Sequence, residues 1–151
     1  MDKKITVTVP VEIDFEKVYN ALCSGLEGGI NYWAMIGDYV EPKAIWHGKG
    51  EADTFPHVDY PMSEGGAITV WEHQEELDPD AEPVLDEDGD EDETANMPSY
   101  RLDLAAIARG VAILARESPY QFGQLISEDG GDADTGDALI QCALLGEIRY
   151  G

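Results

Sequence analysis

Residues 5–29 read ITVTVPVEIDFEKVYNALCSGLEGG, and within this stretch the spacing of apolar residues changes from every second position to every third or fourth. Residues 5–9 alternate β-branched apolar residues with threonine and stop at Pro10, which predicts a half-buried strand. Asp14 then offers an N-cap for a helix that a pair of glycines ends. A strand followed by a helix predicts a chain of mixed class.

Three further segments have the composition of strands. Residues 30–36 and 67–71 are rich in aromatic and apolar residues, and residues 44–47 could pair with the first of them. Residues 48–66, between them, are rich in glycine and proline and read as turns. Residues 147–150 are predicted to add a short closing strand. Together these segments predict a small antiparallel sheet.

Helical spacing returns in the last third of the chain. One helix is predicted to begin at an Asp103 cap and to end at Ser118, where Pro119 starts a short second helix that runs to about Ser127. Asp134, with Asp137 three residues later, resembles a capping box for a last helix. The fold class predicted for residues 1–151 is therefore α+β, a single domain with a small antiparallel sheet packed against about four helices.

The negative charge is concentrated in the middle of the chain. The net charge is -23, and residues 51–100 hold seventeen acids and no lysine or arginine. Residues 72–98 combine most of these acids with prolines and few apolar residues, so we predict a long, acidic, flexible insertion in the domain. Such a charge repels nucleic acid and anionic lipid and attracts basic partners.

No motif predicts an enzyme or a metal site. His47, His57, Asp59 and His73 are spread too widely for a common zinc motif, and the acids at residues 86–92 do not fit a calcium loop. Cys23 and Cys142 lie in apolar helical patterns, which indicates buried free thiols. We therefore predict a non-catalytic protein with no metal and no cofactor.

Three arginines form the other pattern of interest. Arg101, Arg109 and Arg116 follow one another at seven or eight residues, close to two helical turns, in the region predicted to be helical. They read either as a solvated stripe that balances the acidic insertion or as an anion-binding or inter-subunit surface. Trp33 similarly reads either as a core residue or as an exposed stacking platform.

Two stretches carry a resemblance to a known family. LEGGINYW at residues 26–33, together with DADTGDALIQ at 132–141 and GEIRYG at 146–151, resembles a family of small bacteriophage proteins. The resemblance covers the two ends of the chain and not the insertion. The resemblance implies a phage or prophage origin. Small phage proteins without catalytic motifs often inhibit host defences, so analogy with them predicts the same role for this chain.

The predicted function is inhibition of a host defence system, such as a CRISPR effector, in the host cytoplasm. The acidic surface would mimic nucleic acid and occupy the basic groove of a host nucleic-acid-binding protein, without binding nucleic acid or membrane itself. Its predicted contact residues are Asp86, Glu87, Asp88, Asp90, Glu91, Asp92 and Glu93.

Two alternatives remain open at this point. One is an oligomeric sponge for a cyclic nucleotide signal, using Trp33 for stacking and Arg101, Arg109 and Arg116 for phosphate. The other is a structural or accessory phage protein whose acidity serves only solubility.

Overall fold

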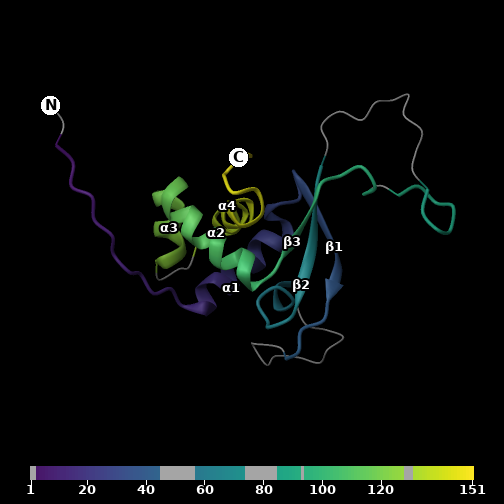
Figure 1. Ribbon diagram of the computed structural model, residues 1–151, viewed down its shortest axis with the longest axis horizontal. Coiled ribbons are helices and arrows are strands. Elements are labelled where there is room, and N and C mark those ends of the chain that lie inside the picture. The colour runs from purple at the N-terminus through teal and green to yellow at the C-terminus, as the bar shows by residue number, and fades with distance from the viewer. Residues whose placement is uncertain (1–2, 45–56, 74–84, 93, 128–130) are drawn as a thin grey trace.

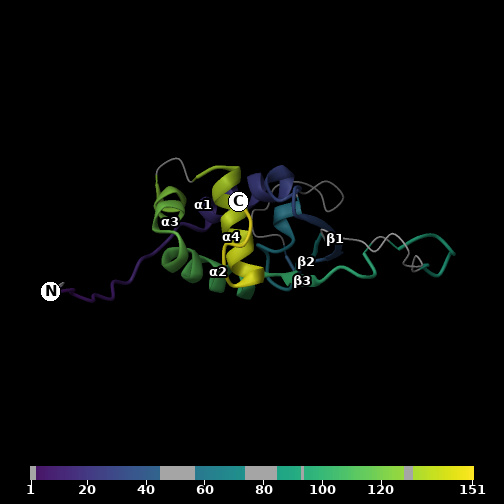
Figure 2. The same cartoon turned by 90° about the horizontal axis from the view of Figure 1, so that it is seen from above.

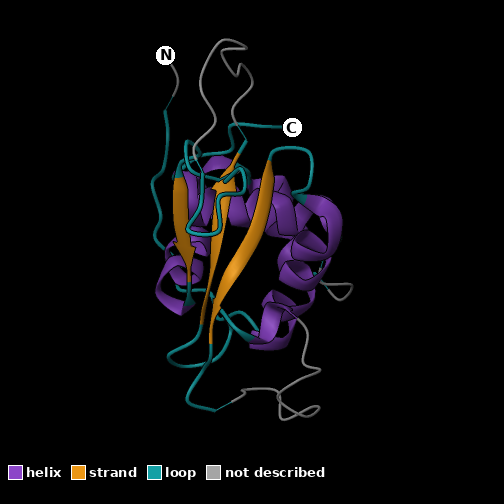
Figure 3. Cartoon of the chain, turned by 90° about the vertical axis from the view of Figure 1, so that its right-hand side faces the viewer, coloured by secondary structure: helices purple, strands orange, loops and turns teal. Residues whose placement is uncertain are grey.

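The computed structural model describes residues 3–44, 57–73, 85–92, 94–127 and 131–151. Within these residues the chain forms four α-helices and one three-stranded antiparallel sheet, so the predicted α+β class is confirmed. The helices gather against one side of the sheet (Figures 1 and 3). The elements are α1 (Phe15–Ser24), η1 (Gly25–Gly29), β1 (Ala34–Val40), η2 (His57–Asp59), β2 (Ala67–Glu72), β3 (Ser99–Leu102), α2 (Leu104–Glu117), α3 (Pro119–Ile126) and α4 (Ala133–Leu145).

Helix α4 is the centre of the fold. Every residue from Thr135 to Ala143 is buried, and α4 packs against α1, α2, α3 and β3 (Figure 2). The buried residues of α4 include polar ones, Thr135, Asp137 and Gln141, as well as apolar ones, so α4 has only a weak apolar stripe. The other three helices each bury one face against it.

Glycines let the helices approach α4 closely. A Cβ atom added at Gly136 would lie 2.0 Å from the carbonyl oxygen of Ala21 on α1. A Cβ atom added at Gly110 of α2 would lie 2.7 Å from the Cβ atom of Ala143. Both helix pairs therefore depend on the missing side chain, because the backbones leave no room for one.

The predicted helices are confirmed, with two corrections to their caps. Asp14 stands at the N-cap position of α1, but its side chain makes no capping hydrogen bond. Asp103 caps α2 by accepting from the N–H of Ala106 at 2.9 Å, and Ser118 caps α3, whose first residue is Pro119. The capping box at Asp134 is wrong, because Asp132 caps α4 by accepting from the backbone N–H groups of residues 134 and 135. The side chain of Asp137 is engaged elsewhere.

The strands differ more from prediction. Residues 5–9 form no strand; they run as an exposed extended chain away from the body (Figure 1). The strand predicted at residues 30–36 is displaced to Ala34–Val40, since η1 continues the first helix and a turn follows it. Residues 147–150 form no strand either, and most of the strand predicted at residues 44–47 lies outside the described residues.

The sheet has the order β1-β2-β3. Trp71 of β2 lies opposite Met35 of β1 on one side and opposite Ser99 of β3 on the other. β3, which the sequence did not predict, takes up residues 99–102, and Glu72 belongs to β2. The acidic insertion therefore begins after Glu72, and residues 74–84 and 93 within it lie outside the described residues.

Candidate functional site

The acidic turn, residues 85–92, is held by its own hydrogen bonds. The Oδ1 atom of Asp86 accepts from the backbone N–H groups of Asp88 and Asp90, each at 2.9 Å. The N–H of Asp86 donates to the carbonyl oxygen of Asp90 at 2.7 Å, and an isolated β-bridge joins the two ends of the turn. This is the local geometry that aspartate favours in turns, so the acids themselves shape the turn.

The acidic turn presents its charge to solvent. All residues from 85 to 92 are exposed, and the turn stands well away from the helices and the sheet (Figures 1 and 2). Six of the predicted contact residues are therefore placed together on one projecting element, and the seventh, Glu93, lies outside the described residues. A cluster of solvated carboxylates of this kind can engage several cationic side chains at once.

The residues proposed for the sponge are placed differently. Trp33 is buried, its Nε1 atom donates to Asp137 Oδ1 at 2.7 Å, and its ring stacks on Tyr150 with centroids 5.4 Å apart. The predicted helical row of arginines is wrong for Arg101, which lies on β3 and pairs with Asp103 at 3.1 Å. Trp33 in this position serves the core and leaves no face for a ligand to stack on.

Arg109 and Arg116 do lie on α2, as predicted, and both are exposed. Arg116 Nε lies 3.9 Å from Glu117 Oε1. Their exposure is compatible with both predicted roles, a solvated stripe and an anion-binding or inter-subunit surface.

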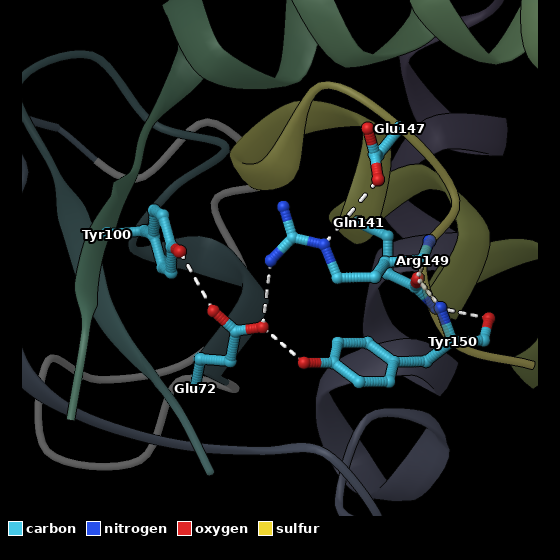
Figure 4. A network of polar contacts seen from close by, with 6 residues as sticks. All are labelled: Glu72, Tyr100, Gln141, Glu147, Arg149 and Tyr150. Atoms are coloured by element: carbon cyan, nitrogen blue, oxygen red, sulfur yellow. Dashed lines mark hydrogen bonds and ion pairs between the residues drawn. The ribbon is translucent and has the colours of Figure 1, made fainter. Parts of the chain in front are cut away.

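Glu72, the last residue of β2, accepts several hydrogen bonds at the end of the sheet (Figure 4). Its side chain is buried, and it accepts from the Tyr100 hydroxyl at 2.9 Å, from Arg149 Nη1 at 3.1 Å, and from the Tyr150 hydroxyl. Arg149 also pairs with Glu147 at 3.5 Å. Glu72 thus joins β2, β3 and the C-terminal segment, residues 147–151.

These contacts determine the charge state of Glu72. Burial alone would raise its pKa, but the hydrogen bonds from Tyr150 and Tyr100 and the charge of Arg149 outweigh burial and lower the pKa below its ordinary value. The carboxylate is accordingly ionised at neutral pH. The bond to Glu72, together with burial, raises the pKa of the Tyr150 hydroxyl, which stays protonated as a donor.

Gln141 of α4 holds the same segment through its backbone. Its Oε1 atom accepts from the N–H groups of Arg149 and Tyr150, both at 2.8 Å, and its Nε2 atom donates to the carbonyl oxygen of Tyr150 at 3.1 Å. The same Nε2 atom donates to Asp137 Oδ1 at 2.9 Å. The side-chain amide, which is fully buried, therefore acts as a strand partner would for this short segment.

Asp137 lines a pocket of about 440 Å³. Its Oδ2 atom accepts from the Tyr32 hydroxyl at 2.6 Å. Burial and this bond raise the pKa of Tyr32, which therefore remains a donor. The pocket is lined by Tyr32, Ser118, Gln121, Asp134, Asp137, Ala138, Gln141, Ile148, Tyr150 and Gly151.

The charge of this pocket disfavours an anionic ligand. Its lining holds two carboxylates, those of Asp134 and Asp137, and no lysine, arginine or histidine. Residues at the N-termini of α3 and α4 line the pocket, and the partial positive charge of a helix N-terminus is roughly half a unit, so the two helices together offset at most about one of the two carboxylates. A cyclic nucleotide phosphate would therefore meet net negative charge, whereas a neutral or cationic group would not.

Asp59 is the remaining buried acid. It is fully buried on η2, and neither of its carboxylate oxygens has a hydrogen bond of regular geometry to another described residue. The Tyr19 hydroxyl is close enough that burial and Asp59 together raise the pKa of Tyr19. Burial, followed by the charges of Glu27 and Asp59, raises the pKa of Cys23 in the same way.

The histidine set considered for a metal is dispersed. His57 faces Glu27 at 3.8 Å and stacks on Tyr39, and His47 lies outside the described residues. Across the described ranges no three His, Cys, Asp or Glu side chains converge as metal ligands. Both cysteines are free, and burial raises the pKa of Cys142 to about 11, so its thiol is protonated.

Three of the residues that organise this region were missed by sequence reasoning. The sequence pattern groups Glu72 with the solvated acids and Asp137 with a capping box, and it predicts no role for Gln141. A glutamine in the middle of an apolar helical face is the one local signal, because an isolated amide in a core needs partners.

Comparison of the chain with protein-family models, with curated proteins and with solved structures found no match. None of the described helices has the length and apolar character needed to cross a bilayer.

Proposed function

We propose that this chain is a non-catalytic binding protein that occupies a basic protein surface, with the acidic turn at residues 85–92 as its principal contact. The observation that carries the proposal is the turn itself, which holds six exposed carboxylates on a short, internally bonded element away from the body. The intended surface is a groove that otherwise binds nucleic acid, as in a host defence nuclease met by a phage protein.

The internal bonding of the turn favours this function over simple solvation. A disordered acidic segment loses conformational entropy when it binds, and that loss weakens the complex. In the acidic turn, Asp86 already fixes the backbone of Asp88 and Asp90, so part of that entropy is lost before binding. Carboxylates held in this way can imitate the regular negative charge of a nucleic acid backbone.

The cyclic nucleotide sponge has weaker support. It requires an aromatic face and arginines at one site, whereas Trp33 is buried and Arg101 is paired with Asp103. The 440 Å³ pocket offers carboxylates where a phosphate would need cations. A protein partner therefore fits the described surface better than a small anionic ligand.

The proposal is tested by matched charge removal. In one variant the six acids of the turn become Asn or Gln; Asp86→Asn keeps a side-chain oxygen that can accept the same hydrogen bonds. The control variant removes six exposed acids elsewhere, so both variants have the same net charge. The control positions are Glu12, Glu16, Glu27, Glu64, Glu117 and Asp134.

A host protein captured on the wild-type chain is purified, and its affinity for each variant is measured over a range of salt concentrations. A second measurement follows whether each variant displaces duplex DNA from the host protein. We expect the turn variant to lose at least about tenfold in affinity at low salt and the control to lose far less, because exposed charges act within about 8 Å at physiological ionic strength. Equal losses of affinity for the two variants would show that only total charge matters. If the wild-type chain captures no specific partner, solubility remains as the role of the acids.

A further inference from the structure

The N-terminal arm, residues 3–13, is an exposed strand-like segment without a sheet. Ile5, Val7, Val9 and Val11 are 90%, 71%, 67% and 52% exposed, and their alternation places all four side chains on one face of the extended chain. β-Branched residues at every second position are typical of a strand that buries one face. An apolar face of this length left in water is typical of an interaction site.

The arm does not reach the sheet of its own chain, which lies on the opposite side of the molecule. The arm leaves α1 on the side away from the sheet in both views (Figures 1 and 2). Within the described residues β1 is an outer strand, with β2 on its inner side only. The backbone groups on the outer side of an edge strand are available to pair with a further strand.

We propose that the arm of one copy of this chain adds to the edge of β1 in a second copy, and that the exchange is reciprocal. β1 spans seven residues, whereas β3, the other outer strand, spans four. The regular part of β1 is Ala34–Gly37, before a bulge at Asp38, whose φ is 46°. Ile36 within it is only partly buried although it packs against the core, so an added apolar strand would complete its burial.

Charge determines the direction of the added strand. Lys3 and Lys4 open the arm, and Asp38 and Glu41 lie at the C-terminal end of β1, all four exposed. An antiparallel arm brings the two lysines beside the two acids, whereas a parallel arm would not. This pairing matters in a chain with a net charge of -23, whose copies otherwise repel each other.

Pro10 fixes which backbone groups pair. Successive N–H groups of a strand point to opposite sides, and proline within a sheet is tolerated where its missing N–H would face solvent. The N–H groups of Ile5, Val7 and Val9 must therefore point toward β1, because Pro10 belongs to the other set. The exposed side of the arm then consists of the backbones of Thr6, Thr8 and Pro10.

The test measures self-association of the full chain by sedimentation equilibrium over a wide concentration range. We expect a dimer that Val7→Asp weakens by at least about a hundredfold, since burial of each of the two exchanged valines is lost. Thr8→Asp adds the same charge on the other face and should weaken the dimer far less. A chain that stays monomeric at every concentration, or equal effects of the two variants, would overturn the proposal.

Two further measurements identify β1 as the acceptor. Lys4→Glu should weaken the dimer, and adding Glu41→Lys in the same chain should restore it, because the reversed charges meet again. Amide hydrogen exchange in the dimer should be slow at Val7 and Val9 and fast at Thr6 and Thr8. Protection of the arm without restoration by Glu41→Lys would indicate that the arms pair with each other, which contradicts the proposed acceptor.

Salt separates this interface from the proposed function. Salt weakens the attraction of Lys3 and Lys4 to Asp38 and Glu41, but it reduces the repulsion between two copies of net charge -23 by more, so the dimer should strengthen as salt rises. Binding of the acidic turn to a basic partner should weaken under the same change.

Discussion

Replacement of Gln141 by leucine tests how the C-terminal segment is held. Leucine has a similar volume and leaves little cavity in α4, so the variant removes hydrogen bonds more than packing. Four of the bonds are of ordinary length: to Asp137 at 2.9 Å, to the carbonyl oxygen of Tyr150 at 3.1 Å, and from the N–H groups of Arg149 and Tyr150 at 2.8 Å. Each contributes about 1 kcal/mol net, so the expected loss is about 4 kcal/mol.

That loss is large against the total stability of a domain, which is about 5–15 kcal/mol. For a chain of this length it corresponds to a fall in Tm of roughly 10 °C. The assay is urea unfolding monitored by tryptophan fluorescence. One of the reporting tryptophans is Trp33, whose ring stacks on that of Tyr150. The slope of the free energy of unfolding with urea should be unchanged, because the surface exposed on unfolding is nearly the same.

The control is Gln124→Leu. Gln124 lies exposed on α3 and should change the free energy of unfolding by no more than about 0.5 kcal/mol. A loss below about 1 kcal/mol for Gln141→Leu, with the amides of Arg149 and Tyr150 still protected from hydrogen exchange, would refute the view that this amide secures the segment.

Three shorter predictions concern stability. The pKa of Glu72 is lowered in the folded state, so its contacts as a carboxylate contribute fully above the unfolded pKa of about 4.3. The difference in free energy of unfolding between the wild type and Glu72→Gln, measured by urea unfolding, should therefore be constant near neutral pH and shrink as pH falls below about 4. Gly136→Ala should cost about 3 kcal/mol or more in thermal unfolding, since the added Cβ meets backbone at 2.0 Å, whereas Gly123→Ala, with open space around it, should stabilise α3 by up to about 1 kcal/mol. Asp132→Ala should cost about 1 kcal/mol by removing the cap of α4, and no loss in thermal unfolding would contradict that role.

The sequence predicted the helices well because their signals are local. The spacing of apolar residues, the Asp103 cap and the Ser118–Pro119 junction all act within a few residues, and the structure confirms each of them. The charge distribution is likewise a property of the sequence alone. The concentration of acids in one segment requires no tertiary contact.

The strands were predicted less well because a strand depends on a neighbour. Residues 5–9 have the alternation of a strand yet pair with nothing in the described chain, while β3 at residues 99–102 has a weak pattern and pairs with β2. Arg101 moved from a helix to a strand for this reason. Hydrogen bonds between strands join residues far apart in sequence, which local periodicity does not report.

The sequence by itself determined the mixed class of the fold, the approximate positions of its helices and the position of its acidic segment, because composition and short-range spacing suffice for these. Only the tertiary structure decided the roles of individual polar residues. Glu72 and Asp86 look alike in an acidic stretch, yet Glu72 is buried against Arg149 and Tyr150, and Asp86 is exposed in the acidic turn. The physical reason is desolvation: a carboxylate that loses water needs donors, and those of Glu72 come from Tyr100, 28 positions away, and from Arg149 and Tyr150, 77 and 78 positions away.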